Sequence, residues 1–390
     1  MKELEYPFDA AYIIKKRKSL KKALLADGTS RIRKKIAVFG GSTTSDIVKT
    51  LELFLLDAGI EPEFYESEYA QYFQDAMFPD ETLLSFKPDI VFIHTTNRNV
   101  TDWPEMTDTT EQIDEKLHTE INRFTAMWKS IAEKFHCPII QNNFEMPLYR
   151  LLGSRDAWDI HGRTNFLTRL NEAFYAYARE NESFYIHDLN FVSADYGLKE
   201  WSNPLFWNMY KYAMCFEAIP SFAFSVSHII KSIFGKNKKA LALDLDNTLW
   251  GGVVGDDGVD GIEIGQETGV SQSYYEFQTY VKQLKSLGIV LTVCSKNDHE
   301  NAIAGLNHPE GALRPDDFVI IKANWENKDR NIAETAAELN ILPDSIVFAD
   351  DNPAEREIVR TQIKGAAVPD MDGVENYITT IDRSGFFEVT

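Results

Sequence analysis

Short apolar runs alternate with stretches of helical periodicity along most of this chain, and this alternation limits its possible folds more than any other feature. In the first series the runs cover residues 36–39, 62–65, 89–94, 138–140 and 184–186. Helical stretches near 111–135 and 162–180 separate the later runs. Strands that alternate with helices favour a parallel sheet that is covered by helices on both faces.

A polar break at 235–239 precedes a second series of the same kind. Its runs cover residues 240–244, 289–294, 318–321, 345–349 and 366–368. Between the first two runs, Ser273 and Glu276 have the spacing of a capping box, which predicts a helix over 273–287. We therefore predict an α/β protein with two doubly wound, Rossmann-like parallel-sheet domains, at residues 36–235 and 236–390.

The first 35 residues differ from the rest of the chain in charge. The whole chain of 390 residues carries a formal charge of −20, yet residues 1–35 hold 11 basic and 4 acidic side chains. Asp9 is suited to cap a helix over residues 9–26, and the basic residues lie on this helix and just after it. We predict a short basic helical arm at 1–35, which is either a solvated helix face or a docking site for an acidic partner.

The overall composition argues against several classes of protein. With 44% hydrophobic residues the chain can form cores, but its apolar stretches end well before the ~18 residues of a membrane helix. A pI near 4.9 argues against nucleic acid as a partner. The start lacks the apolar run of a signal peptide, and the three widely spaced cysteines fit a reducing compartment, so we expect a cytoplasmic protein.

Acidic residues gather at the ends of two predicted strands of the second series. Asp244 and Asp246 come at the end of the first run, and Asp350 and Asp351 follow the fourth. Ligands bind outside the carboxyl ends of the strands in parallel α/β sheets. Neighbouring carboxylates repel each other unless a cation compensates them, and an all-oxygen site suits Mg²⁺. We therefore predict that these four residues form a Mg²⁺ site.

Two further strand ends supply groups that bind anions. Ser295 closes the second run and offers a hydroxyl, and Lys328 places an ammonium after the third run. Lys296 and Lys322 lie nearby and are alternatives to Lys328. The sequence therefore predicts an anion site close to the metal site.

The order and spacing of these motifs resemble the haloacid dehalogenase (HAD) superfamily over about residues 238–370. The resemblance implies a Mg²⁺-dependent enzyme of phosphoryl transfer. Asp244 would attack phosphorus and become an aspartyl phosphate, and Asp246 would act as general acid and then as base. Ser295 and Lys328 would hold the phosphoryl oxygens. The implied metal ligands are Asp244, the carbonyl of Asp246, Asp350 and Asp351.

The sequence around these motifs resembles a narrower group, the FkbH-like proteins of HAD subfamily IIIC. The segments that carry this resemblance are 244–258, 295–297, 324–332 and 348–356, with 40–44 and 71–72 upstream, so that it covers about residues 31–390. Proteins of this group remove phosphate from 1,3-bisphosphoglycerate and place a glyceryl thioester on an acyl carrier protein. The resemblance implies a phosphorylated small molecule as substrate and an acyl carrier protein as partner. Longer relatives carry a further acyltransferase-like domain, which we expect this chain to lack.

The segment at 250–258 is rich in glycine and ends in the turn pair Asp257-Gly258, which predicts a hairpin flap that can lie close to a ligand. No insertion large enough for a separate cap lies between Thr248 and Ser295, so we expect a HAD fold with a minimal cap and an open site. The residues expected to contact substrate are Thr248, Asn297, Trp250, Gly251 and Gly252.

Cys294 directly precedes Ser295 and has two possible roles. As a catalytic residue it would hold the glyceryl group as an enzyme thioester. It is otherwise a small buried cysteine at a strand end. The sequence leaves both roles open.

The first domain resembles the SGNH hydrolases in its layout. Residues 40–42, Gly-Gly-Ser, follow the first run, and Asn97 follows the run at 89–94. Such enzymes also need a late Asp-x-x-His pair to activate the serine, and none lies between 180 and 235. We therefore expect an SGNH-like domain that has lost catalysis, with a working hydrolase as the alternative.

These observations lead to one main functional prediction and two alternatives. We predict a phosphatase or phosphotransferase of the FkbH-like type that dephosphorylates a phosphoglycerate-type substrate and can load glyceryl onto a carrier protein. A stand-alone phosphatase acting on a sugar phosphate or a phosphoprotein would have the same motifs. A non-catalytic adaptor of a biosynthetic assembly is the third possibility.

Overall fold

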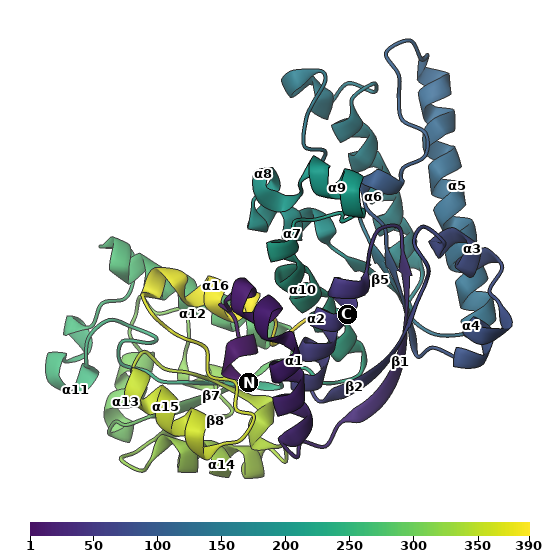
Figure 1. The fold of residues 1–390 in the computed structure, drawn as a ribbon. Helices are drawn as coiled ribbons and strands as arrows, with labels where there is room; N and C mark the ends of the chain where they lie inside the picture. Colours follow the sequence, from purple (N-terminus) through teal and green to yellow (C-terminus); the bar gives the residue numbers. More distant parts are fainter. The chain divides into compact units, whose positions relative to one another are not determined.

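The computed structural model describes all 390 residues, and their contacts divide the chain into two compact units. The amino-terminal unit comprises Asp9–Phe234 with Thr390, and the carboxyl-terminal unit comprises Gly235–Val389 with Met1–Phe8. Each unit contains one parallel sheet with helices around it (Figure 1). The predicted α/β class with two parallel sheets is therefore confirmed. The division into three functional domains stays a prediction.

The sheet of the amino-terminal unit has the strand order β2-β1-β3-β4-β5, and all its pairs are parallel. Its strands are β1 (Ile32–Gly40), β2 (Ile60–Glu66), β3 (Ile90–His94), β4 (Ile139–Asn142) and β5 (Phe184–His187). The predicted run at 36–39 is only the buried end of β1. The strand begins earlier, at its basic residues, because Ile32 already pairs with Ile60.

Helices cover both faces of this sheet. On one face α2 (Ser45–Asp57) packs against α1 (Ala10–Ala26) and α10 (Ile219–Ile233), and α10 contacts α7 (Leu189–Tyr196). The opposite face carries α3 (Tyr72–Met77), α4 (Glu81–Phe86), α5 (Thr110–Phe135) and α6 (Arg163–Glu180). The short helices α8 (Leu198–Trp201) and α9 (Pro204–Tyr210) precede α10. The helix predicted over 9–26 is α1, and Asp9 caps it by accepting from the Tyr12 N–H.

The sheet of the carboxyl-terminal unit has the strand order β8-β7-β6-β9, again all parallel. Its strands are β6 (Ala240–Leu243), β7 (Val290–Ser295), β8 (Ile320–Ala323) and β9 (Ile346–Ala349). The prediction of a strand at 366–368 is wrong, because only a single bridge joins Ala367 to Val347. Pro369 follows at once, and proline has no N–H with which to continue a ladder.

The helices of this unit are α11 (Val254–Asp257), α12 (Gly269–Ser286), α13 (His299–Leu306), α14 (Lys328–Glu338), α15 (Pro353–Gln362) and α16 (Tyr377–Arg383). The predicted start of α12 at Ser273 is wrong. The helix begins at Gly269, because the Thr268 side chain accepts a hydrogen bond from the Ser271 N–H and caps it there. None of the helices in the chain combines the length and apolar character that crossing a membrane requires.

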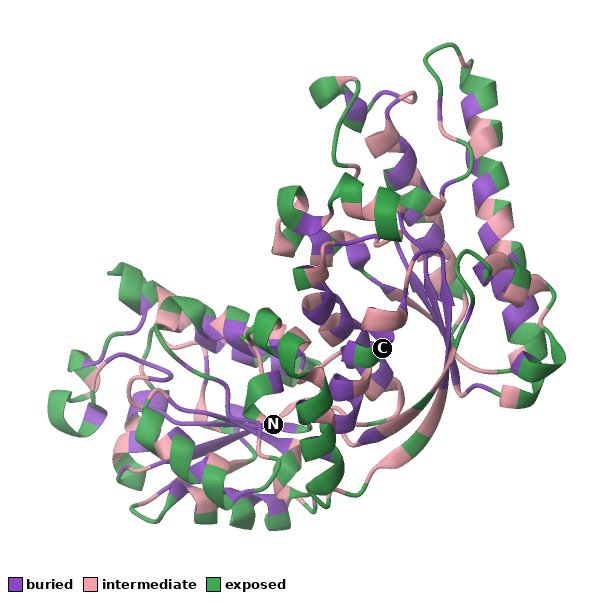
Figure 2. Ribbon diagram, viewed as in Figure 1, coloured by how far each residue is buried: buried purple, intermediate pink, exposed green.

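Alternate residues of β6 and β7 face two separate apolar layers, as the pleat of a strand dictates. Leu241 and Leu243 pack with α12, α13 and α16, whereas Ala242 and Cys294 pack with α14 and α15. The strands lie buried between these layers, and the helices are exposed on their outer faces (Figure 2). With both faces covered, the carboxyl edge of the sheet is the place where polar side chains reach solvent.

Candidate active site

The loops after β6, β7 and β9, together with the start of α14, surround a small polar hollow at the carboxyl edge of the second sheet. Its volume is about 200 Å³. Its lining residues are Asp244, Asp246, Asn247, Ser295, Lys296, Lys328, Asp351, Asn352 and Glu355. The structure thus brings together residues from the separate strand ends at which the sequence predicts chemistry.

Asp244 lies directly after β6, and its N–H donates to the carbonyl of Ala349 on the neighbouring strand. The residue is only 7% exposed. Its Oδ2 lies 3.1 Å from Nζ of Lys328, but its Oδ1 is buried and has no hydrogen-bond partner. Since a buried polar atom without a partner is costly, this oxygen is suited to bind a cation or to face a reacting group.

Asp350 and Asp351 follow β9 and bring their carboxylates to Asp244. One carboxylate oxygen from each of the three residues lies within 4.8 Å of the others. Burial, followed by the charge of Asp244, raises the pKa of Asp350 to about 7 and also raises the pKa of Asp351. A cation would relieve this repulsion, and three oxygen ligands suit Mg²⁺.

Lys328 is the first residue of α14, and its side chain is 3% exposed. Its ammonium contacts both Asp244 and Asp350. Burial opposes the charged form, but the two carboxylates outweigh it and raise the pKa of Lys328 above its usual value. Lys322 lies outside the hollow and pairs with Glu334 and Glu338. It is therefore not the lysine at the acidic cluster, the name we give to Asp244, Asp350 and Asp351.

Lys296, the other alternative to Lys328, does line the hollow. Its Nζ lies 2.6 Å from Oε1 of Glu355, and not against the acidic cluster. Among the three candidate lysines, the geometry therefore places Lys328 at the cluster and Lys296 at its margin.

Asp246 is held by three hydrogen-bond donors. Its Oδ1 accepts from the indole Nε1 of Trp250 at 2.9 Å and from the N–H of Val254 at 3.0 Å. Its Oδ2 accepts from Nδ2 of Asn297 at 2.8 Å. Burial raises the pKa of Asp246, although the two N–H groups on Oδ1 oppose this effect. The side chain is therefore fixed at the edge of the hollow.

Ser295, at the end of β7, is buried and lines the hollow. Thr248 lies beside the hollow and does not line it. Its hydroxyl accepts from the N–H of Asp351 at 3.2 Å and lies 3.5 Å from Oδ1 of the same residue. Thr248 therefore connects the loop after β6, which carries Asp244 and Asp246, to the loop after β9, which carries Asp350 and Asp351. We call these the first and second acidic loops, and we did not predict this role for Thr248.

The segment after Thr248 does not form the predicted hairpin. A single antiparallel bridge joins Gly251 to Glu263, and the chain between them turns through α11. The side chain of Asp257 accepts from the N–H of Val253 and so stabilises this helical turn. The prediction of a hairpin at 250–258 was therefore wrong, because this local capping outweighs the turn preference of Asp257-Gly258.

The residues of this segment that we expect to contact substrate make contacts within the protein. Trp250 is 1% exposed and packs in the apolar layer of α12, while its N–H reaches Asp246. Gly252 has φ +90°, and its N–H donates to Oδ1 of Asn247. Trp250, Gly251 and Gly252 do not line the hollow. Asn297 does not line it either, and it contacts Asp246.

Cys294 does not line the hollow. It is 1% exposed and packs with Ala242 of β6, Phe348 of β9 and Ile332 of α14. Its Sγ lies 3.6 Å from the carbonyl of Lys328, and burial raises the pKa of the thiol well above its usual value. The geometry therefore favours the structural role over the catalytic role, because alternation along β7 turns Ser295 and Cys294 to opposite faces.

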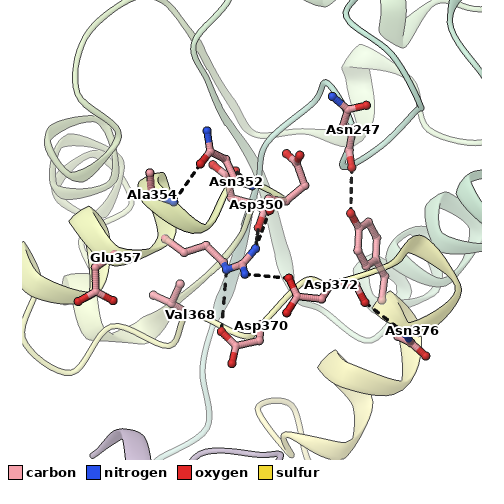
Figure 3. A network of polar contacts seen from close by, with 12 residues as sticks. Asn247, Asp350, Asn352, Ala354, Glu357, Val368, Asp370, Asp372 and Asn376 are labelled. Carbon is pink, nitrogen blue, oxygen red and sulfur yellow. Dashed lines mark hydrogen bonds and ion pairs between the residues drawn. The ribbon is translucent and has the colours of Figure 1, made fainter.

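Arg356 on α15 supports the second acidic loop, and we assigned it no role from the sequence. Its Nη1 donates to the carbonyls of Asp350 and Asp351 at 2.9 and 2.7 Å, and its Nη2 donates to Asp372 at 3.1 Å. Its Nε lies 3.9 Å from Oδ1 of Asp370. Figure 3 shows Asp350, Asp370 and Asp372 near one another. A buried arginine six residues after Asp350 was the available signal, but its burial is not visible in the sequence.

In the amino-terminal unit, Ser42 and Asn97 lie after β1 and β3. The Ser42 hydroxyl is buried and has no hydrogen-bond partner, so no base is bonded to it. The side chain of Asn97 is engaged elsewhere, since its Nδ2 donates to the carbonyls of Glu145 and Met146 at 3.4 and 3.5 Å. The geometry therefore offers the serine no activating partner, and the SGNH-like assignment stays a prediction.

Comparison with known proteins adds two findings to this geometry. The family described as FkbH, N-terminal domain, matches residues 35–231, which is half of the chain. The chain belongs to the FkbH N-terminal domain family. The predicted resemblance to FkbH-like proteins is thus confirmed at the level of the family. No curated protein matches the chain significantly.

Among solved structures, the FkbH-family chain resembles the N-terminal part of protein BF1531 from Bacteroides fragilis, which contains a phosphatase domain and is complexed with Mg. The identity is 30% and the TM-score 0.86, with 96% of this chain and 98% of that chain covered. A GDSL-like lipase from Bacteroides thetaiotaomicron is 13% identical, covers 56% of this chain and 99% of its own, and has a TM-score of 0.31. A similarity as low as this second one supports no functional argument.

Proposed function

We propose that this FkbH-family chain is a Mg²⁺-dependent enzyme of phosphoryl transfer of the HAD type. The single observation that carries the proposal is Asp244, which lies at a strand end beside Asp350, Asp351 and Lys328 and whose buried Oδ1 has no hydrogen-bond partner. The phosphatase domain of BF1531, which is complexed with Mg, supports the same reading.

The residues at the acidic cluster fit Mg²⁺. All the donors are oxygens, one of them lacks any partner, and burial together with the charge of Asp244 raises the pKa of Asp350. Asp244, Asp350 and Asp351 would hold the ion, together with the Asp246 carbonyl. When bound, the ion would neutralise charge on the phosphoryl oxygens.

The reaction proposed for these residues has two steps. A carboxylate oxygen of Asp244 attacks phosphorus, the bond from phosphorus to the leaving oxygen breaks, and Asp246 gives that oxygen a proton. Water then attacks the aspartyl phosphate and passes a proton to Asp246, which releases phosphate and restores Asp244. Lys328 and Ser295 hold the phosphoryl oxygens, since both side chains line the hollow.

For the substrate we propose a phosphoglycerate-type molecule, with an acyl carrier protein as partner. One observation favours an acidic partner. Lys15, Lys18 and Lys22 of α1 are exposed and lie on one face of the helix, at positions i, i+3 and i+7. The neighbouring Lys21, by contrast, pairs with Glu52. An acidic protein would meet this stripe more favourably than the rest of a chain with a charge of −20.

The burial of Cys294 favours a second candidate, a stand-alone phosphatase that acts on a sugar phosphate or phosphoprotein. A thiol without access to the hollow could not carry a glyceryl group, so transfer to a carrier would have to proceed without it. Incubation with 1,3-bisphosphoglycerate, Mg²⁺ and an acyl carrier protein separates the two candidates. Glyceryl on the carrier, detected by intact-protein mass spectrometry, supports the first, and phosphate release without loading supports the second.

The test of the shared chemistry is Asp244→Asn, which keeps the shape of the side chain but removes the nucleophile. We expect it to abolish Mg²⁺-dependent phosphate release. Full activity in this variant would overturn the proposed function.

A further inference from the structure

The hydrogen bonds on Asp246 leave one place on its carboxylate free. Oδ1 accepts two N–H bonds, from Trp250 at 2.9 Å and from Val254 at 3.0 Å, and these occupy both of its lone pairs. Oδ2 accepts one bond, from Asn297 at 2.8 Å, and keeps one lone pair. A proton that Asp246 carries or receives would therefore sit on Oδ2.

The indole that holds Oδ1 is itself fixed on all sides. Trp250 is 1% exposed and packs in the apolar layer that includes Leu249 and Phe277. Gly305 of α13 lies against the ring, and a Cβ added there would come within 2.7 Å of two ring carbons. The carbonyl of Leu249 accepts from Nε2 of Gln278, which fixes the backbone just before the ring. The ring therefore has no room to turn away from Asp246.

We propose that Trp250 and Asn297 are positioning residues that hold the carboxylate of Asp246 with Oδ2 available for proton transfer. The inference rests on the proposed function, in which Asp246 protonates the leaving oxygen and later accepts a proton from water. The two side chains hold opposite oxygens of the carboxylate, and the Val254 N–H adds a third bond on Oδ1. Loss of either side chain leaves two of these three bonds, which weakens the hold on the carboxylate and lets its orientation vary. Proton transfer needs the acid within hydrogen-bond reach of the leaving group, and a rotated carboxylate loses that reach.

The experiment compares two phosphate esters of similar size, assayed with Mg²⁺. The leaving group of p-nitrophenyl phosphate departs without needing a proton, whereas that of phenyl phosphate benefits from one. We compare kcat/KM, which reports the steps up to departure of the leaving group and excludes the later hydrolysis of the aspartyl phosphate, in which Asp246 acts on both esters alike. We expect Trp250→Phe and Asn297→Leu each to lower kcat/KM on phenyl phosphate by about tenfold or more, out of the roughly 10²–10⁴-fold that general acid catalysis supplies. The kcat/KM on p-nitrophenyl phosphate should fall by less.

Two further variants serve as controls for this comparison, one that removes the acid itself and one that should have no effect on it. Asp246→Asn should show the same preference for p-nitrophenyl phosphate in stronger form. Trp128→Phe is the matched control, since Trp128 is also buried and also donates its indole N–H, to Gln141 in the amino-terminal unit. It should leave the ratio of the two rates unchanged. Should Trp250→Phe fail to fold, Asn297→Leu makes the same test from the other oxygen.

The possible outcomes distinguish a failure of this inference from a failure of the proposed function. An equal loss of kcat/KM on both esters in Trp250→Phe and Asn297→Leu would mean structural damage and would overturn the inference alone. A wild-type chain that hydrolyses only p-nitrophenyl phosphate would lack acid assistance and would overturn it too. A wild-type chain that releases phosphate neither from these esters nor from 1,3-bisphosphoglycerate would overturn the proposed function, and the inference with it.

Discussion

Replacing Lys328 by methionine tests the electrostatic design of the acidic cluster. The ammonium lies between Asp244 and Asp350, and the lysine is almost fully buried. Methionine keeps most of the volume but removes the charge, which leaves two buried carboxylates without compensation. Removing one partner of a buried ion pair costs about 3–5 kcal/mol. We therefore expect the carboxyl-terminal unit of Lys328→Met to be less stable by about this amount in the absence of Mg²⁺.

Magnesium should reverse part of this loss. Without the lysine, the cation no longer competes with an ammonium for the carboxylates, so the variant should bind Mg²⁺ more tightly than the wild type. Each tenfold gain in affinity adds about 1.4 kcal/mol of stabilisation at saturating metal. The variant should nevertheless be nearly inactive, because the group that holds the phosphoryl oxygens is gone.

Urea unfolding at pH 8, with EDTA and with Mg²⁺, measures both effects. At this pH Asp350 of the wild type, with a pKa of about 7, is mostly ionised, and loss of Lys328 raises this pKa further. Lys322→Met is the matched control, since Lys322 pairs only with the exposed Glu334 and Glu338, and its loss should cost less than about 1 kcal/mol in either condition. A loss in Lys328→Met that is as small as in the control, or that Mg²⁺ leaves unchanged, would refute the reasoning.

Three other predictions follow from the same geometry. Arg356→Met should weaken Mg²⁺ binding and lower stability by about 1–3 kcal/mol, because it leaves the carbonyls of Asp350 and Asp351 without this donor. Isothermal titration calorimetry measures the affinity, and an unchanged affinity would contradict this role. Cys294→Ala should keep phosphate release near the wild-type rate, and iodoacetamide should not modify Cys294 in the folded chain, as peptide mass spectrometry would detect; loss of carrier loading in this variant alone would contradict its structural role. Burial lowers the pKa of His94 and His187 to about 3, so both stay neutral in the folded chain, whereas the unfolded chain protonates them below pH 6.5. The contribution of these histidines to stability should therefore be complete above pH 6.5 and should fall by up to about 1.4 kcal/mol per pH unit for each histidine between pH 6.5 and 3. Urea midpoints that stay constant over this range would contradict the prediction.

The sequence predicts the architecture well because its signal is local. Each strand of the second sheet contains a short apolar run, and of the predicted runs only 366–368 forms no strand. Parallel pairing brings the carboxyl ends of the strands to one edge of the sheet, independently of the loops. The errors arise where several local signals compete. Ser273 and Glu276 have the spacing of a capping box, but Thr268 caps the helix earlier, and both readings are locally reasonable.

The site could be predicted only as a set of residues at strand ends. By itself the sequence determined that Asp244, Asp246 and the Asp350-Asp351 pair share one sheet edge, because period-2 burial and parallel topology leave them no other place. Only the tertiary structure decided that Lys328 is the lysine at the acidic cluster and that Cys294 faces the core. It also decided that Trp250 and Asn297 donate to Asp246, and that Arg356 donates to the second acidic loop. These outcomes depend on side chains from distant segments meeting across a packed interior, and on a single residue of register along β7. Such packing is decided by the whole fold, and no local pattern encodes it.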